Sequence, residues 1–290
     1  MPGSVRAPVL VGADGSPAAM QAVRWAAHEA ACQRCALHIV YAVGVPIDVG
    51  PTFGYAPIDG ETCRRAGQVT AEATRDVATA AAVPIADIEI ETFVADAAPV
   101  PLLRDCSAHA RLLVVGTRGL GAFRRGLLGS VSTSLARHAR CPVAVVPEHP
   151  PDPRGPVVVG VDGSPYSARA IQIAFAVAAR RDVELVAVHA WSEFYRYLSR
   201  DELQEEAAGL LAENLAGYRE RYPDLRVRRT IVADRPARAL LDAATDPQLL
   251  VVGSRGRGGF AGMTLGSVSQ AVLHAAHCPV LIARASDRDR

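Results

Sequence analysis

The 290-residue chain contains no lysine, and all 31 of its basic residues are arginine. This absence excludes a Walker A loop, which needs a lysine on the phosphates, and it excludes Schiff-base chemistry and lysine general bases. An excess of charge of one sign is also lacking, because 30 acidic residues leave a formal net charge of +1. We therefore expect no broad electrostatic attraction to nucleic acid or to an anionic membrane. Any anion-binding site must be a local pocket of defined geometry.

Long hydrophobic runs are missing as well. No uncharged stretch reaches the roughly 18 apolar residues of a membrane span, and Met1–Arg6 contains no signal-peptide core. We expect no membrane span and a cytoplasmic protein, whose six cysteines are free thiols. Cys32-Gln-Arg-Cys35 lies near the end of an expected helix, not at its start, so we interpret this pair as incidental and not as a redox motif.

The sequence contains an internal repeat, in which the main motifs of the first half return in the second. Pro8-Val-Leu-Val-Gly-Ala-Asp-Gly-Ser-Pro17 returns 148 residues later as Pro156-Val-Val-Val-Gly-Val-Asp-Gly-Ser-Pro165. Leu112-Leu-Val-Val-Gly-Thr-Arg-Gly119 returns 137 residues later as Leu249-Leu-Val-Val-Gly-Ser-Arg-Gly256. The first half thus carries 11 extra residues, which we place in 44–60. The proline-rich stretch 149–155 predicts a linker between a domain at 1–148 and a second at 156–290.

Each half alternates continuous Val/Leu/Ile strands with helices, which indicates a parallel sheet covered on both faces. We therefore predict an α/β protein with two tandem doubly wound domains, in which ligands bind where the strand order reverses. The expected strands are 8–12, 36–43, 88–94, 111–116 and 142–146, then 157–161, 183–189, 226–232, 249–253 and 280–283. The expected helices of the first half are 16–33, 61–81, 99–110 and 130–138.

The first candidate site motif, Val11-Gly-Ala-Asp-Gly-Ser16, ends an expected strand and opens a helix, and Gly160-Val-Asp-Gly-Ser164 repeats it. Glycine lets the backbone turn tightly and lets a ligand approach. Asp14 and Asp162 could accept hydrogen bonds from a ribose or a base, or face a metal ion. They fit an Asx turn or a helix cap equally well.

The second motif is more specific. Gly116-x-x-Gly119 is followed after nine residues by Gly129-Ser130, and Gly253-x-x-Gly256 is followed after nine residues by Gly266-Ser267. Each motif runs from the end of a strand to the start of a helix, where free N–H groups and glycines suit a phosphate. The alternative is a flexible loop in which the serines are plain N-caps, but two copies in register with two aspartate motifs favour the phosphate interpretation.

Together these motifs resemble the ATP-binding branch of the universal stress protein family, over nearly the whole chain. The resemblance implies two Rossmann-like, adenine nucleotide alpha hydrolase-like domains, each with a five-stranded parallel sheet and four helices. It implies two ATP molecules per chain, with Mg²⁺ on the phosphates. It also implies that the two domains pair through their last strands, with a homodimer as a further possibility.

Carried over residue by residue, the resemblance places Gly12 and Asp14, and in the second half Gly160 and Asp162, on the adenosine side of each site. The residues that would cradle the phosphates are Gly116, Gly119, Gly129, Ser130 and Val131, and in the second half Gly253, Gly256, Gly266, Ser267 and Val268. The loops differ between the halves, so the resemblance does not assign phosphate to any one of Arg118, Arg124, Arg125, Arg255 and Arg257.

No set of histidines and acids assembles into a catalytic motif, and the sequence therefore predicts no catalytic residue. We expect a nucleotide-dependent stress or growth regulator that acts on a protein partner the sequence does not name. The alternative is a slow ATPase or an adenylating enzyme on the same fold. An ATP-pyrophosphatase would need Ser-Gly-Gly-x-Asp-Ser after its first strand, where this chain has Val-Gly-Ala-Asp-Gly-Ser.

Overall fold

The computed structural model describes residues 6–44, 60–119, 128–191, 199–243, 246–258 and 264–284. The chain divides into two compact units, Met1–Glu148 and His149–Arg290. Each unit is an α/β domain with one parallel five-stranded sheet, which confirms the fold class. Within the described ranges, no helix combines the length and the apolar character needed to cross a membrane.

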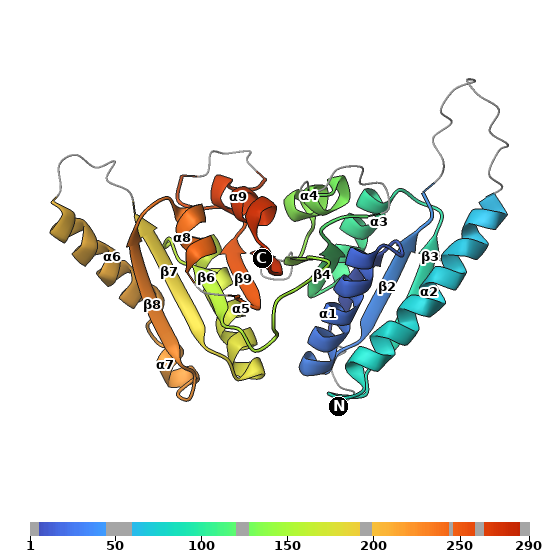
Figure 1. The fold of residues 1–290 in the computed structure, drawn as a ribbon, viewed down its shortest axis with the longest axis horizontal. Coiled ribbons are helices and arrows are strands. Elements are labelled where there is room, and N and C mark those ends of the chain that lie inside the picture. Colours follow the sequence, from blue (N-terminus) through green and yellow to red (C-terminus); the bar gives the residue numbers. More distant parts are fainter. Residues whose placement is uncertain are drawn as a thin grey trace, which may run out of the picture. The chain divides into compact units, whose positions relative to one another are not determined.

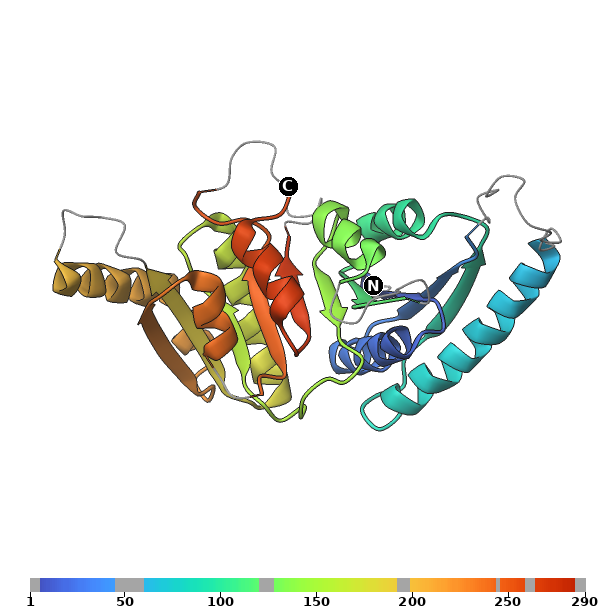
Figure 2. The same cartoon turned by 45° about the horizontal axis from the view of Figure 1, so that its top comes forward.

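The first unit arranges its strands in the order β3-β2-β1-β4-β5 (Figure 1). Its strands are β1 (Val9–Ala13), β2 (Leu37–Ala42), β3 (Ile90–Ala95), β4 (Leu112–Gly116) and β5 (Val143–Val146). Its helices are α1 (Pro17–Gln33), α2 (Gly60–Ala82), α3 (Pro99–Cys106) and α4 (Ser130–His138), with a 3₁₀ turn at Ser107–His109. Helices α1 and α2 cover one face of the sheet, and α3 and α4 cover the other (Figure 2).

The second unit repeats this plan in the order β8-β7-β6-β9-β10. Its strands are β6 (Val157–Gly160), β7 (Leu185–Trp191), β8 (Val227–Ala233), β9 (Leu249–Gly253) and β10 (Val280–Ala283). Its helices are α5 (Pro165–Arg181), α6 (Arg200–Asn214), α7 (Tyr218–Arg221), α8 (Pro236–Asp242) and α9 (Ser267–Ala275). The helix that corresponds to α2 is divided into α6 and α7, because Gly217 adopts a φ of 79° that a continuing helix does not allow.

The expected elements of the first half are present within about two residues, with one difference. The expected helix 99–110 ends at Cys106 and continues as the 3₁₀ turn, whose Ser107 carbonyl accepts the N–H of Ala110. Cys32 lies in the last turn of α1 and Cys35 follows its C-cap, Arg34, so this pair does not open a helix. Among the described residues, no disulfide bond involves Cys32, Cys35, Cys106, Cys141 or Cys278.

Small side chains bring the first helix of each unit close to the sheet. In α1, Ala22, Ala26 and Ala30 are fully buried at intervals of four residues, so the face of the helix that they form has only small side chains. A Cβ atom at Gly116 would lie 2.7 Å from the carbonyl carbon of Ala18, and one at Gly253 would lie 2.8 Å from that of Tyr166. These two glycines are therefore required where the end of the strand passes the first turn of the helix.

The strand order reverses beside the first strand of each unit. β1 pairs with β2 on one side and with β4 on the other, and β6 pairs in the same way with β7 and β9. All of these pairs are parallel, so their carboxyl ends lie at one edge of the sheet. Connections leave in opposite directions at this point, which opens a crevice between the two neighbouring strand ends.

Candidate functional site

The aspartate of the first motif forms the turn between strand and helix. One carboxylate oxygen of Asp14 accepts the N–H of Ser16 at 3.0 Å, and Asp162 accepts that of Ser164 at 2.9 Å. In the first unit, the residue between Asp14 and Ser16 is Gly15, whose φ of 82° means that the turn needs glycine. The Asx-turn interpretation is therefore confirmed for this oxygen.

The second carboxylate oxygen of each aspartate faces the glycine loop. A Cβ atom at Gly256 would lie 2.6 Å from Oδ2 of Asp162, and one at Gly119 would overlap Oδ2 of Asp14. The turn role therefore does not exclude a ligand role, because one oxygen holds the turn and the other reaches the loop that follows β4 or β9. Asp14 and Asp162 each bring a negative charge to the crevice.

A serine hydroxyl ties the two motifs together in each unit. Ser16 caps α1 by accepting the N–H of Ala19 at 3.2 Å, and its hydroxyl donates to the carbonyl of Arg118 at 3.2 Å. Ser164 accepts the N–H of Ser167 at 3.2 Å and donates more weakly to the carbonyl of Arg255 at 3.5 Å. The start of the helix and the glycine loop are thus fixed relative to each other, although they lie about a hundred residues apart in sequence.

The glycine loop is closed by hydrogen bonds of the same kind in both units. The N–H of Gly129 donates to the carbonyl of Thr117 at 2.8 Å, and the N–H of Gly266 donates to that of Ser254 at 2.8 Å. Two buried serines, Ser132 and Ser269, donate to the carbonyls that end β4 and β9 at 2.7 and 2.6 Å. Neither serine is among the site residues that the sequence predicts, although both copies of Leu-Gly-Ser-Val-Ser contain them.

Helices α4 and α9 begin at this closure. Their N-caps are Gly129 and Gly266, which provide no side-chain cap. The interpretation of Ser130 and Ser267 as plain N-caps is therefore wrong, because both are exposed first residues of the helix. The first turn of each helix offers N–H groups and a serine hydroxyl to the crevice.

A cavity lies at each crevice, with a volume of about 790 Å³ in the first unit and about 260 Å³ in the second. Every site residue expected from the sequence lines one of the two. The first cavity is lined by Gly12, Asp14, Gly116, Gly119, Gly129, Ser130 and Val131. The second is lined by Gly160, Asp162, Gly253, Gly256, Gly266, Ser267 and Val268. The structure thus brings together residues that are more than a hundred positions apart.

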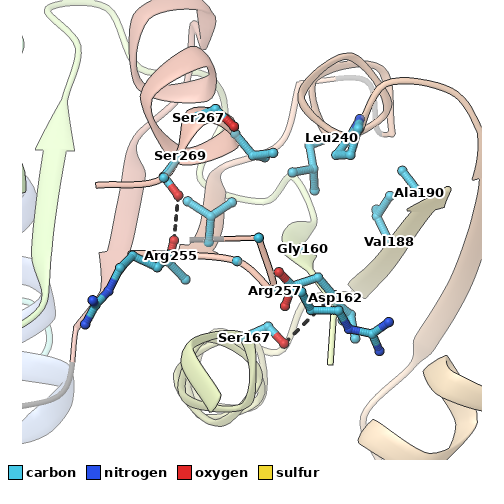
Figure 3. Close-up of a pocket in the computed structure, with 18 residues that line it drawn as sticks. Gly160, Asp162, Ser167, Val188, Ala190, Leu240, Arg255, Arg257, Ser267 and Ser269 are labelled. Atoms are coloured by element: carbon cyan, nitrogen blue, oxygen red, sulfur yellow. Dashed lines mark hydrogen bonds between the residues drawn. The ribbon is translucent and has the colours of Figure 1, made fainter. Parts of the chain in front are cut away.

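Each cavity also has an apolar wall, whose residues are not among those that the sequence predicts for the site. In the first unit the wall consists of Val40, Ala42, Pro99, Leu103 and Val115. In the second it consists of the corresponding Val188, Ala190, Pro236, Leu240 and Val252, and Figure 3 shows Leu240 on one side of the cavity with Val188 and Ala190. Gly12 makes room for the wall, because a Cβ atom there would lie 2.7 Å from a methyl group of Leu103. Such a wall suits a flat apolar group beside the polar loop.

The arginines of the loops differ in position. Arg118 lines the first cavity, whereas Arg255 and Arg257 line the second. The guanidinium carbon of Arg255 lies 4.5 Å from the centre of the Tyr166 ring. The remaining two candidates, Arg124 and Arg125, lie outside the described residues.

The described residues contain no group of three or more His, Cys, Asp or Glu side chains that could hold a metal ion. Among those residues, Asp14 and Asp162 are the only acidic side chains that line the two cavities, and no histidine lines either of them. The nearby His189 is buried and bonded through Nδ1 to the carbonyl of Val161 at 2.7 Å. In the part of the chain that the structure describes, neither cavity is lined by an acid–base pair.

Comparison with known proteins agrees with this arrangement. Residues 6–147 and 153–284 each match the model of the universal stress protein family. Universal stress protein Rv2005c of Mycobacterium tuberculosis H37Rv is 45% identical over 287 residues, which cover 96% of this chain and 97% of that protein. Universal stress protein Rv1996 of the same organism is 42% identical over 301 residues, with coverage of 95% and 94%. A solved universal stress protein from Archaeoglobus fulgidus, 22% identical, covers 97% of each chain with a TM-score of 0.64, which shows the shared fold. The chain therefore belongs to the universal stress protein family.

Proposed function

We propose that each domain binds one ATP molecule at its crevice and that the protein is a cytoplasmic, nucleotide-dependent regulator of stress or growth. The observation that carries this proposal is that the same three features meet at one cavity in each domain. These features are an apolar wall, a carboxylate that reaches the glycine loop, and a helix N-terminus with no side-chain cap. They match the three parts of ATP in order: the adenine ring, the ribose hydroxyls and the phosphates.

The residues present fit such a ligand. Gly119 and Gly256 leave the loop backbone open at points where any side chain would overlap the aspartate carboxylate. The first cavity, at about 790 Å³, lies within the range of roughly 300–1,000 Å³ that is typical of small-molecule sites, and the second, at about 260 Å³, lies just below it. Because the chain has no lysine, the phosphates would be held by backbone N–H groups, by Ser130 and Ser267, and by arginine.

In this proposal ATP supplies the triphosphate charge and the anhydride bonds, and the chain supplies binding and orientation. Leu103 and Leu240 would contact the base, Asp14 and Asp162 would accept a ribose hydroxyl, and the first turns of α4 and α9 would bind phosphate oxygens. A Mg²⁺ ion would need no protein cage, because it is commonly held by one or two carboxylates together with substrate phosphates.

Regulation by occupancy is favoured over enzymatic turnover. Phosphoryl transfer needs an oriented nucleophile and neutralised charge, and among the described residues each cavity is lined by one carboxylate that already holds a turn. A slow ATPase is the second candidate, because a bound phosphate chain beside Asp14 or Asp162 could be hydrolysed without a dedicated base. Occupancy would act on a protein partner only if that partner distinguishes the loaded from the empty site.

A comparison of ligands by titration calorimetry tests the proposal. We expect ATP to bind more tightly than GTP, and tripolyphosphate to bind least, with Mg²⁺ improving affinity for all three by screening the phosphates. Equal affinities for ATP and tripolyphosphate would show an anion cradle that does not recognise adenosine. No detectable binding of ATP at millimolar concentration would overturn the proposal.

A further inference from the structure

The two crevices share one backbone frame, but the arginines that line them among the described residues differ: Arg118 lines the first, and Arg255 and Arg257 line the second. The residue that follows the second motif glycine is Leu120 in the first repeat and Arg257 in the second. Ala18, in the first turn of α1, is likewise replaced by Tyr166 in α5. The difference therefore lies in side chains beside the phosphate loop, where charge matters most for an anionic ligand.

Arg257 lies over the turn that follows β6. The space that a Cβ atom would fill at Gly163 is bounded by the guanidinium group of Arg257, whose Nε and Cζ lie 3.2 Å from that point. Gly163 has a φ of 75° and no side chain, so the turn leaves room for this arginine. Figure 3 shows Arg257 beside Asp162 at the cavity, which both residues line. Arg257 makes no hydrogen bond or ion pair with any residue of the described ranges.

The neighbouring Arg255 also lines the cavity, but its guanidinium group is held on an aromatic ring. The guanidinium of Arg255 stacks on the ring of Tyr166 at 4.5 Å, and Figure 3 shows its side chain extending away from Arg257. A cation over an aromatic face is stabilised there by the ring quadrupole. Of the two arginines in this loop, Arg255 is thus retained on α5, whereas the charge of Arg257 remains available at the cavity.

We propose that Arg257 is a specificity-determining residue that makes the second site respond to the number of phosphate groups on its nucleotide. This inference rests on the proposed ATP function of the crevice. A guanidinium presents a planar fork of donors that matches phosphate oxygens, so each phosphate lost from the ligand costs more affinity beside Arg257. The first site has Leu120 at the matching position of the sequence, and the arginine that lines its described part is Arg118, at the position that corresponds to Arg255.

The size of the effect follows from the exposure of Arg257. Its side chain is exposed, so solvent and salt screen its interaction with a phosphate group. One exposed charge-assisted hydrogen bond should therefore increase the affinity for the nucleotide about tenfold. We therefore expect Arg257 to increase the ratio of ATP affinity to AMP affinity at the second site about tenfold. This ratio should also fall more steeply with added salt when Arg257 is present than in Arg257→Leu.

The test uses the full chain with one site blocked at a time. Gly119→Val leaves the second site and Gly256→Val leaves the first, and the dissociation constants of ATP, ADP and AMP are measured at low and at physiological salt. Adding Arg257→Leu to the Gly119→Val chain should reduce the ATP-to-AMP ratio about tenfold, while Arg257→Lys should retain most of it. Arg238→Leu is the matched control, because it removes an exposed arginine of α8 that pairs with Asp234 and Asp242 at 3.5 Å and does not line the cavity.

The possible outcomes are distinct. If Arg257→Leu leaves the ratio unchanged, or if Arg238→Leu lowers it equally, the inference is overturned while ATP binding itself stands. If neither site binds any of the three nucleotides, the proposed function fails and the inference fails with it. Circular dichroism of each variant checks that the fold is retained, which we expect because Arg257 is exposed.

Discussion

Blocking one crevice by a single side chain is the sharpest test of two separate sites. In Gly256→Val, the new Cβ would lie 2.6 Å from Oδ2 of Asp162, whereas ordinary contact begins near 3.4 Å. The carboxylate must therefore move by about 0.8 Å or more, which would break the 2.9 Å hydrogen bond that it accepts from the N–H of Ser164. We expect this change to cost about 1 kcal/mol of folding free energy, the typical net value of one hydrogen bond.

The effect on binding should be much larger. A side chain at this loop position separates the phosphates from the backbone, and two hydrogen bonds to a charged group contribute about 1.5–3 kcal/mol each. A loss of about 3–6 kcal/mol corresponds to a weakening of roughly 10² to 10⁴-fold. By calorimetry, we expect about two ATP molecules per chain in the wild type, about one in Gly256→Val or in Gly119→Val, and none in the double variant.

The control is Gly209→Val in α6, where a Cβ would meet nothing within 4 Å and no cavity wall is affected. This variant should still bind two ATP molecules, and all variants should keep the wild-type circular dichroism spectrum. A wild-type stoichiometry of one, or a single variant that empties both sites while it remains folded, would refute the reasoning. The repeat in the structure would then not be a repeat in function.

Three further predictions concern turnover, packing and thiol chemistry. ATP hydrolysis should be slower than roughly 0.01 per second, about a hundredfold below the low end of ordinary enzymes, and faster phosphate release that is lost in the double glycine variant would favour the ATPase alternative. Gly116→Ala should lower the free energy of unfolding by about 1–3 kcal/mol, because its Cβ would lie 2.7 Å from the backbone of α1, whereas Gly209→Ala on an exposed helix surface should raise it by up to about 1 kcal/mol. If urea titrations show that both substitutions lower the free energy of unfolding, or that both raise it, the packing argument is contradicted. Burial raises the pKa of Cys278 from 9.0 to about 12, so this thiol should resist alkylation in the native protein and react after unfolding. Because only the unfolded thiol ionises between those values, Cys278 should reduce stability as the pH rises from 9.0 towards about 12, and rapid native labelling near neutral pH would disprove its burial.

The sequence alone determined the architecture, for a local reason. Continuous runs such as Val9–Ala13 and Leu112–Gly116 are buried strands, and Ser16 before Pro17 starts a helix at the residue expected from capping chemistry. The order of strands and helices then allows few topologies, because parallel strands require crossover helices. The repeat supplied a second copy of each signal, and the motif glycines and aspartates were identified from their spacing.

Only the tertiary structure decided what each of those residues does. The motifs assign Gly116 and Gly12 to the ligand, yet the structure shows that both are also required for packing, against the backbone of α1 and against Leu103 respectively. The apolar wall formed by β2, α3 and β4 carries no local signal, because Val40 and Leu103 look like any other core residues until the fold places them beside Asp14. The same holds for Arg255 and Arg257, which stand two positions apart in the chain. Whether a long arginine side chain is held on a ring or remains at the cavity depends on contacts between distant segments, and no sequence spacing specifies those contacts.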